Sequence, residues 1–181
     1  MVHVNVDSTG GIGATSLTGT AVTPEAVSLA TDAIAAETGQ HYTGKRPSHS
    51  ADQSFWGVGI PSMFGSLSMH VPGTETFGPA TMRNALGWWW HTPHDLIDKI
   101  DESFLMRDTR VFVHVLWRLL TEPTLLLQPL AAIESLLREL RDLAPRLPET
   151  VPAAMVTGAA EALLAQSLPS GQTADRSLVG A

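Results

Sequence analysis

The sequence predicts an α/β protein: part of a mixed, mostly parallel sheet covered by helices, with a C-terminal helical hairpin. A stretch at about 2–6, in which valines alternate with polar residues, indicates one strand, and the apolar segment 61–69 indicates a second. Apolar residues recur at helical spacing in the segments between and after them. Two strands do not complete a doubly wound sheet, so we expect the chain to form part of a larger α/β fold.

Two helices are expected in the first two-thirds of the chain. The first begins at Pro24, a residue favoured in a first turn, with Thr23 as its N-cap, and Gly39 supplies its stop. The second begins after Asp101, which is a good N-cap, and ends before Pro123. These signals are local, so they predict where each helix starts and stops.

The tail predicts two further helices, at about 128–143 and 153–168. A short heptad-like seam of leucines and one isoleucine runs along the first of them and suits either dimerisation or packing on the same chain. We expect residues 123–168 to form a helical tail and residues 169–181 to be a disordered end. The seam consists of Leu126, Leu130, Ile133, Leu137 and Leu140.

Composition excludes several classes of protein. The 181 residues contain no cysteine, which excludes a disulfide scaffold, a thiolate zinc finger and a cysteine nucleophile. The chain has a formal net charge of −7 and therefore lacks the basic surface that is typical of nucleic-acid-binding proteins. No apolar run reaches the about 18 residues that span a membrane, and no signal peptide is visible. The compartment stays open, with a cytoplasmic location favoured.

Two familiar kinds of site fail simple tests. Gly11 and Gly13 nearly match the dinucleotide-binding fingerprint, but Ser16 replaces the third glycine and the helix starts only near Pro24. A serine hydrolase would need a G-x-S-x-G elbow after a strand, and the sequence has none. We therefore expect a plain glycine-rich loop after the first strand.

Asp7 and His91 carry the strongest chemical signal. Asp7 is a carboxylate at the C-terminal end of a strand, where α/β proteins place ligands and catalytic groups. His91 follows three tryptophans and precedes Thr92-Pro93, so bulky aromatic residues would hold its ring in place, as suits a metal ligand. The alternative is structural: Asp7 caps the glycine loop and His91 is a satisfied, half-buried histidine.

Three segments in the right order resemble the zinc-dependent peptidase family M-twenty-eight, which contains bacterial aminopeptidases and glutamate-carboxypeptidase-like enzymes. NVDSTGG (5–11) looks like the family's strand-end segment with a carboxylate zinc ligand. HSADQSFWGVGIPSM (49–63) is similar to its S-D-x-x-S/P-F…G-I-P segment, and WHTPHDLIDKID (90–101) resembles its late H-T-x-x-D-T motif with a ligand histidine. The likeness covers roughly residues 2–122.

The resemblance implies a phosphorylase/hydrolase-like fold and a site with two zinc ions. Asp7 would bind one zinc ion and His91 the other. Asp52 would match a site-shaping aspartate of the middle segment, and Asp95 an aspartate that lies behind the ligands or fixes the loop. His49 lies beside the middle segment and is a candidate to line the substrate cleft. His94 forms an H-x-x-H pair with His91, a spacing that can indicate metal binding, but we expect His94 to be a solvent-facing loop residue.

The other donors of the family precede the strand-end segment, and only six residues precede Asp7 here. Residues 1–122 would then be the C-terminal half of a di-zinc catalytic domain. Leu96 replaces the family's common threonine, which weakens the hydrogen bonding of the loop, and Ile60 stands where some aminopeptidases have a tyrosine, so we assign no oxyanion-stabilising residue. The family's base glutamate also precedes the strand-end segment, so we assign no catalytic residue. The expected function is exopeptidase or aminopeptidase hydrolysis by a two-zinc-activated water, with this chain an incomplete, weakly active or inactive portion.

Two alternatives stay open at this point. The chain could be a catalytically silent binding or assembly module that docks a partner through the tryptophans and the tail, or a small-molecule amidohydrolase on the same scaffold. Expected partners are a peptide or amino-acyl substrate, together with an upstream half or a second copy bound through the tail. Nucleic acid and membrane are not expected partners.

Overall fold

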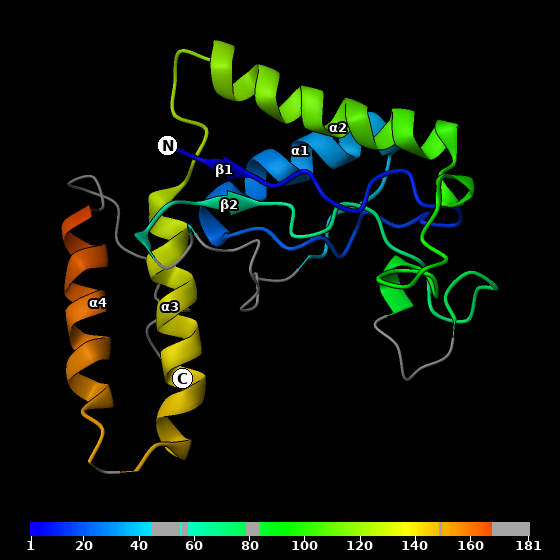
Figure 1. The fold of residues 1–181 in the computed structure, drawn as a ribbon. Helices are drawn as coiled ribbons and strands as arrows, with labels where there is room; N and C mark the ends of the chain where they lie inside the picture. The colour runs from blue at the N-terminus through cyan, green and yellow to red at the C-terminus, as the bar shows by residue number, and fades with distance from the viewer. Residues whose placement is uncertain (45–54, 56–57, 79–83, 149, 168–181) are drawn as a thin grey trace. The chain divides into compact units, whose positions relative to one another are not determined.

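A computed structural model describes residues 1–44, 55, 58–78, 84–148 and 150–167. The chain divides into two compact units, Met1–Leu127 and Gln128–Ala181, each of which is described by itself. Within the described residues, the chain is rich in helix and has one small parallel pair of strands. This agrees with the expected mixture of helix and parallel strand, and Figure 1 shows the elements in order.

The strand pair is shorter than the sequence predicts. β1 (His3–Val4) runs parallel to β2 (Ser62–Met63), with His3 opposite Ser62 and Val4 opposite Met63. Flanking bonds from His3 N–H to the Pro61 carbonyl (2.8 Å) and from Asn5 N–H to the Met63 carbonyl (3.0 Å) extend the pairing slightly. The expected strands at 2–6 and 61–69 are therefore present, but the first is reduced to two residues and the second to two residues near the start of its segment.

The first helix begins differently from the prediction. A short 3₁₀ helix (Pro24–Ala26) leads into α1 (Val27–Thr38), and the Thr23 side chain caps neither. Instead, the Thr23 hydroxyl accepts a hydrogen bond from the Ser62 N–H at 3.1 Å, and the Thr23 N–H donates to the Ser62 carbonyl at 2.9 Å. Thr23 is the N-cap residue of this 3₁₀ helix, as predicted, but its side chain makes no capping hydrogen bond because the buried hydroxyl holds the start of β2 instead.

Both remaining local predictions for this unit are confirmed. α1 ends at Gly39, which has a left-handed φ of 69° that glycine adopts without a steric penalty. α2 (Glu102–Thr121) begins at Asp101, whose carboxylate accepts a hydrogen bond from the Phe104 N–H at 3.1 Å. Glu122 follows as the C-cap, just before Pro123.

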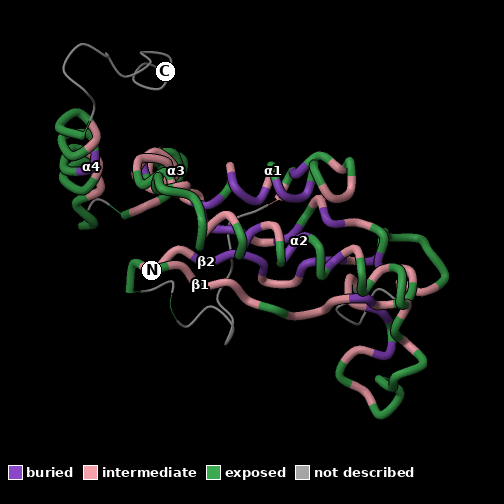
Figure 2. The backbone as a smooth tube through the Cα atoms, turned by 90° about the horizontal axis from the view of Figure 1, so that it is seen from above, coloured by how far each residue is buried: buried purple, intermediate pink, exposed green. Residues whose placement is uncertain are grey.

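The core of unit 1 lies between α1, α2 and the strand pair, and Figure 2 shows buried residues along α1, α2 and β2. Burial of apolar side chains is the main stabilising contribution to such a unit. Phe64 packs edge-on against Phe112 with ring centroids 5.4 Å apart. The core cluster consists of Leu17, Val22, Ala26, Leu29, Ala30, Ala33, Ile34, Tyr42, Met63, Phe64, Leu67, Val111, Phe112 and Val115.

Unit 2 contains the expected helical hairpin. α3 (Pro129–Leu143) and α4 (Ala153–Ser167) lie side by side, joined by a 3₁₀ helix (Ala144–Arg146) and a short linker (Figure 1). An ion pair of 2.7 Å joins Arg141 on α3 to Glu161 on α4. Of the predicted seam, Leu137 is buried, and of α4 only Ala160 is buried among the described residues.

Candidate functional site

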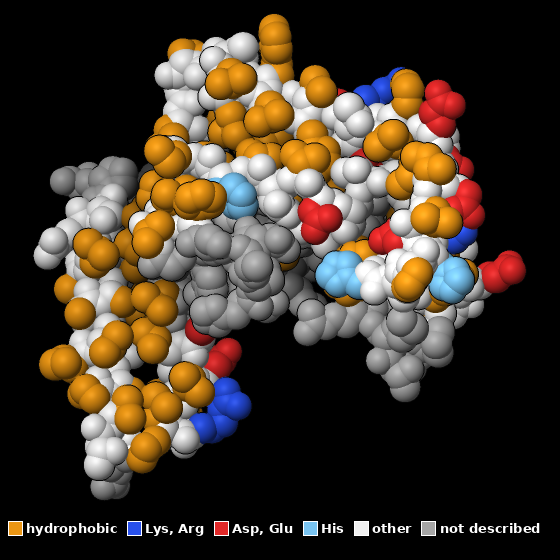
Figure 3. Space-filling model, in the orientation of Figure 1, with side chains coloured by type: hydrophobic (Ala, Val, Ile, Leu, Met, Phe, Trp, Pro, Cys, Tyr) orange, Lys and Arg blue, Asp and Glu red, His pale blue; other side chains and the backbone are white. Residues whose placement is uncertain are grey.

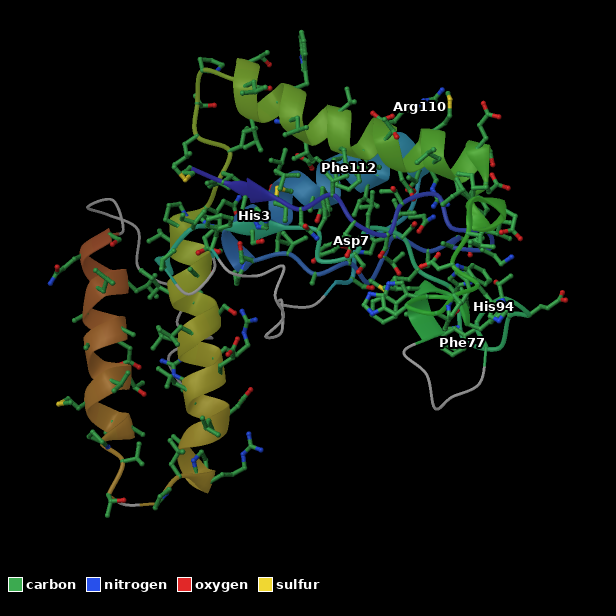
Figure 4. All side chains as sticks on the ribbon, in the orientation of Figure 1. His3, Asp7, Phe77, His94, Arg110 and Phe112 are labelled. Carbon is green, nitrogen blue, oxygen red and sulfur yellow. The ribbon has the colours of Figure 1, made fainter. Side chains whose placement is uncertain are left out.

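Asp7 lies just beyond the carboxyl end of β1 (Figure 4). Its main-chain carbonyl accepts a hydrogen bond from the Leu67 N–H at 3.4 Å, and its carboxylate accepts one from the Ser8 hydroxyl at 3.2 Å. The side chain is half-buried. Because β1 and β2 are parallel, the chain leaves both strands on the same side, so Asp7 lies next to the segment that follows β2.

The loop that follows Asp7 is hydrogen-bonded to the start of α2. Ser8 has a positive φ of 52°, a conformation that non-glycine residues adopt rarely and that turns the chain here. The Gly10 carbonyl then accepts a hydrogen bond from the Asp101 N–H at 2.8 Å, and the Ile12 N–H donates to the Lys99 carbonyl at 2.9 Å. Two of the three segments that resemble the peptidase family are thereby adjacent.

His91 stands in a tight turn. Its φ is 59°, and its ring stacks on that of Trp90 with centroids 3.7 Å apart and planes 22° apart. Its side chain is exposed. The Thr92 hydroxyl and the Thr92 N–H both donate to the Trp89 carbonyl, at 2.6 and 2.9 Å. The turn and the stacked tryptophan hold the imidazole while leaving it accessible.

The remaining predicted site residue in the described part of the chain, Asp95, makes no hydrogen bond there to Asp7 or His91. Asp95 is exposed, and no hydrogen bond to its carboxylate is found among the described residues; Thr92 fixes the turn instead. The His94 ring is tilted against Trp88 with centroids 5.6 Å apart. His49 and Asp52 lie outside the described residues.

These residues do not fit a complete zinc centre. A catalytic zinc site has three protein ligands and a water. Among residues 1–44, 55, 58–78, 84–148 and 150–167, no group of three or more histidine, aspartate or glutamate side chains could hold a metal ion. Asp7 and His91 offer one donor side chain each, so a complete centre would need further donors from elsewhere.

A buried carboxylate that the sequence analysis did not single out organises this region. Asp108 on α2 is completely buried, and its Oδ2 accepts hydrogen bonds from the Gly10 N–H at 2.9 Å and from the Ser68 hydroxyl at 2.7 Å. Its Oδ1 forms an ion pair of 2.7 Å with the guanidinium of Arg107, which also donates to the Ala14 carbonyl. The loop after Asp7, the segment after β2 and α2 all meet at this side chain.

A signal for this carboxylate was present in the sequence. Phe104, Val111 and Val115 recur at the spacing of an inward helix face, and Asp108 falls on the same face. An acidic residue at a core-facing position is rarely buried without a partner. The residue before it is an arginine, which supplies the neutralising charge.

His70 is a second buried polar group close to the site. Its Nδ1 lies 2.7 Å from the Thr76 hydroxyl, and its ring packs edge-on against Trp89 with centroids 5.4 Å apart. Its Nε2 has no hydrogen-bond partner among the described residues. Burial lowers the pKa of His70 below its ordinary 6.5 because the interior disfavours the charged ring.

The glycine pair after β1 accommodates these side chains. A Cβ at Gly13 would lie 2.2 Å from the Thr76 hydroxyl oxygen, and one at Gly11 would lie 3.9 Å from His70 Nε2. The Gly13 position is thus too close to Thr76 for any side chain. This close packing accounts for the glycine at position 13, whereas a Cβ at Gly11 would make only ordinary van der Waals contacts.

The described surface also has a hollow of about 660 Å³ beside the start of α2. Its lining includes neither Asp7 nor His91, and its charges are mixed, so it does not mark the candidate site. The lining residues are Glu37, Asp101, Glu102, Ser103, Met106, Arg107 and Arg110.

Comparisons of the chain with protein-family models, with curated proteins and with solved structures find no match. In the described part of the chain, none of the helices combines the length and the apolar character needed to cross a bilayer.

Proposed function

We propose that this chain supplies the carboxyl-terminal half of an α/β catalytic domain of the zinc-peptidase type, with Asp7 and His91 as two metal donors. The observation that carries the proposal is the pairing of the loop after Asp7 with residues 99–101, which follow His91 in the same segment. The three segments that resemble family M-twenty-eight are 5–11, 49–63 and 90–101. A family-like arrangement requires contacts of this kind among them.

The described parts of all three segments are linked by hydrogen bonds. The Asn5 N–H donates to the carbonyl of Met63, the last residue of the middle segment, at 3.0 Å, and the Asp7 carbonyl accepts from Leu67 just beyond that segment. The Gly10 carbonyl accepts from Asp101, at the end of the third segment. Such links between residues about 60 and 90 positions apart support the proposal of a shared site.

The proposed role of this chain is limited to holding metal. Asp7 contributes a carboxylate, one oxygen of which accepts a hydrogen bond from the Ser8 hydroxyl. His91 contributes an imidazole that stacks on the ring of Trp90. Because two donors do not complete a zinc centre, we derive no hydrolytic step from them, and we expect the chain alone to have little or no peptidase activity. Peptide hydrolysis, the reaction of the family, is the proposed activity of the completed domain.

The geometry can be tested with cysteine pairs, because the chain has no cysteine of its own. The two metals of such a site lie about 4 Å apart and each zinc–ligand bond adds about 2 Å, so the donor atoms of Asp7 and His91 should lie within about 8 Å. We expect an Asp7→Cys/His91→Cys variant to be cross-linked within the chain by a thiol reagent of that span.

The matched control is an Asp7→Cys/Leu120→Cys variant. Leu120 is 83% exposed and lies about 18 Å along α2 from Asp108, which contacts the Gly10 loop, so the same reagent should leave this pair unlinked. Failure of the Asp7–His91 pair to cross-link in folded protein would overturn the proposal.

Metal affinity gives a second readout that does not depend on activity. Isothermal titration of the full chain with zinc chloride should give weak binding, on the order of 10–100 μM, because only two protein donors contribute. Asp7→Ala and His91→Ala should each weaken it, because each variant removes one of the two donors. His94→Ala removes another exposed histidine from the same loop and should leave it unchanged. Binding that neither of the first two variants weakens would contradict the assignment.

A silent docking module is the second candidate function. One observation favours it: Trp88 is 38% exposed, and Leu96 and Ile97 in the same loop region are 60% and 86% exposed. Exposed apolar side chains in this number are typical of interaction surfaces. Absence of zinc binding in the titration, together with an unlinked Asp7–His91 pair, would favour this alternative.

A further inference from the structure

The outward side of α2 carries a continuous stripe of large side chains that nothing in the described part of unit 1 covers. We call it the α2 stripe and define it by Met106, Arg110, Val113, Trp117 and Leu120. The exposed fractions of its four apolar members are 52%, 57%, 67% and 83% in that order. At 3.6 residues per turn, the five positions fall within a sector of about 80°.

The opposite side of the same helix is the buried one. Val111, Phe112 and Val115 pack in the core, and Figure 4 shows Arg110 and Phe112 on opposite sides of α2. Figure 3 shows hydrophobic side chains gathered over α2 on the molecular surface. A helix that is apolar on both sides is typical of an element with a second partner, since an ordinary surface helix has a polar outer face.

The single charge in the stripe also lacks a partner. No hydrogen bond or ion pair to Arg110 is found in the ranges that the structure describes, and its side chain is exposed. The other arginines of α2 differ: Arg107 pairs with Asp108, and Arg118 pairs with Asp32 and Glu122. A cation in the middle of an apolar stripe restricts which surfaces can cover it.

The order of the stripe is self-complementary. Its steps along the chain are four, three, four and three residues, the spacing of a coiled-coil seam. If a second α2 lies antiparallel across it with a two-fold axis at Val113, then Met106 faces Leu120 of the second copy. Arg110 then faces Trp117 twice, once on each side of the axis, and Val113 faces itself.

Charge complementarity selects this arrangement. An arginine guanidinium over a tryptophan ring is a favourable cation–π pair, and the antiparallel arrangement forms two of them. A parallel arrangement would place Arg110 against Arg110, and two like charges at that distance repel. An isologous two-fold contact is also the commonest way in which identical chains associate.

We propose that the α2 stripe is the surface through which two copies of this chain associate as an antiparallel, two-fold symmetric helix pair. The proposal is independent of the metal site, because none of the stripe residues belongs to it. One helix on each side makes a small interface, so the dimer is concentration-dependent, with a Kd on the order of 10 μM.

Sedimentation of the full chain over roughly a hundredfold range of concentration around that Kd tests the association. The mass should rise from that of the 19.3 kDa chain towards twice that value. Val113→Glu places two carboxylates against each other on the axis and should keep the chain monomeric. Because Val113 is 57% exposed, its replacement should leave the helix content unchanged, as circular dichroism will check.

The matched control is Met155→Glu on α4, which is 69% exposed and lies on the other unit. We expect this variant to dimerise like the parent chain. A dimer that Met155→Glu disrupts and Val113→Glu does not would assign the contact to the helical hairpin and overturn the proposal. A parent chain that stays monomeric throughout would overturn it as well.

Cysteine variants test the orientation of the helices. Val113→Cys lies on the axis and should form a disulfide-linked dimer on oxidation. Leu120→Cys alone should stay unlinked, whereas a mixture of Leu120→Cys and Met106→Cys chains should link to each other. Self-linking of Leu120→Cys would show a parallel pair and contradict the proposed antiparallel interface.

Discussion

The N–H of Gly10 donates a hydrogen bond of 2.9 Å to the carboxylate of Asp108, 98 residues later in the chain. The same oxygen accepts from the Ser68 hydroxyl, and the other oxygen is paired with Arg107. One buried side chain thus fixes the loop after Asp7 to the segment after β2 and to α2. The geometry of the candidate site therefore depends on a residue that takes no part in metal binding.

Replacing this carboxylate should destabilise the protein strongly. We expect Asp108→Ala to lower the free energy of unfolding by about 3–5 kcal/mol, because Arg107 loses its partner and the Gly10 N–H is left buried without an acceptor. Urea denaturation followed by circular dichroism measures the change. Asp98→Ala is the control: its carboxylate is 62% exposed beside Lys99, so its replacement should leave stability nearly unchanged.

The Ser68 hydroxyl should contribute less, and in a way that depends on Asp108. Ser68→Ala removes one hydrogen bond to Asp108 and one to the Ser8 carbonyl, and should cost about 1–2 kcal/mol. In the background of Asp108→Ala the cost should fall, because one of the two partners is already gone. Equal costs in both backgrounds, measured by a double-mutant cycle, would mean that the two side chains are not coupled.

Gly10 should not tolerate a side chain. Its φ is +72°, and a Cβ there would lie 2.7 Å from the Cβ of Leu105 on α2. We expect Gly10→Ala to lower the free energy of unfolding by about 1–3 kcal/mol. Gly19 has nothing within 4 Å of an added Cβ and no positive φ, so Gly19→Ala should be neutral or slightly stabilising in the same urea assay.

His70 should make the stability fall in acid. Burial lowers the pKa of His70 in the folded protein, so the unfolded chain binds the proton more readily. This group's contribution is fully present above its ordinary pKa of 6.5 and is lost as pH falls below that value. Urea midpoints measured across this range should drop less steeply in His70→Gln, whereas His41→Gln, an exposed histidine, should keep the parent slope.

Tyr42 should make the stability depend on pH in the alkaline range. Its ionisation can be followed directly by absorbance, because it is the only tyrosine in the chain. Burial raises its pKa to about 12, and its hydroxyl donates to the Thr20 carbonyl at 3.0 Å. Since the unfolded chain ionises near 10.0, this contribution to stability is present below that pH and is lost above it. Tyrosinate absorbance should show no step near 10 while the chain is folded, and a step there in denaturant.

Local signals predicted the helices well and the strands only in outline. Asp101 and Gly39 act through neighbours within four residues, so the sequence contains the interaction that makes each a helix boundary. Thr23 occupies the predicted N-cap position, but its hydroxyl accepts a hydrogen bond from Ser62, 39 residues away, which no local signal could indicate. The strands are shorter than predicted for a related reason. A strand extends only as far as its hydrogen-bonded partner, and the described partner segment is two residues long.

From the sequence alone we could predict helices around two strands of a mostly parallel sheet and a helical hairpin after them, and we could single out Asp7 and His91 as candidate metal donors. These predictions depend on residue type and on spacing within a few turns of chain. The burial of Asp108 beneath the Gly10 loop, the unpaired ring nitrogen of His70 among the described residues and the outward position of the α2 stripe follow from the tertiary structure. Burial and exposure are set by which distant segments pack together, and no local pattern specifies them.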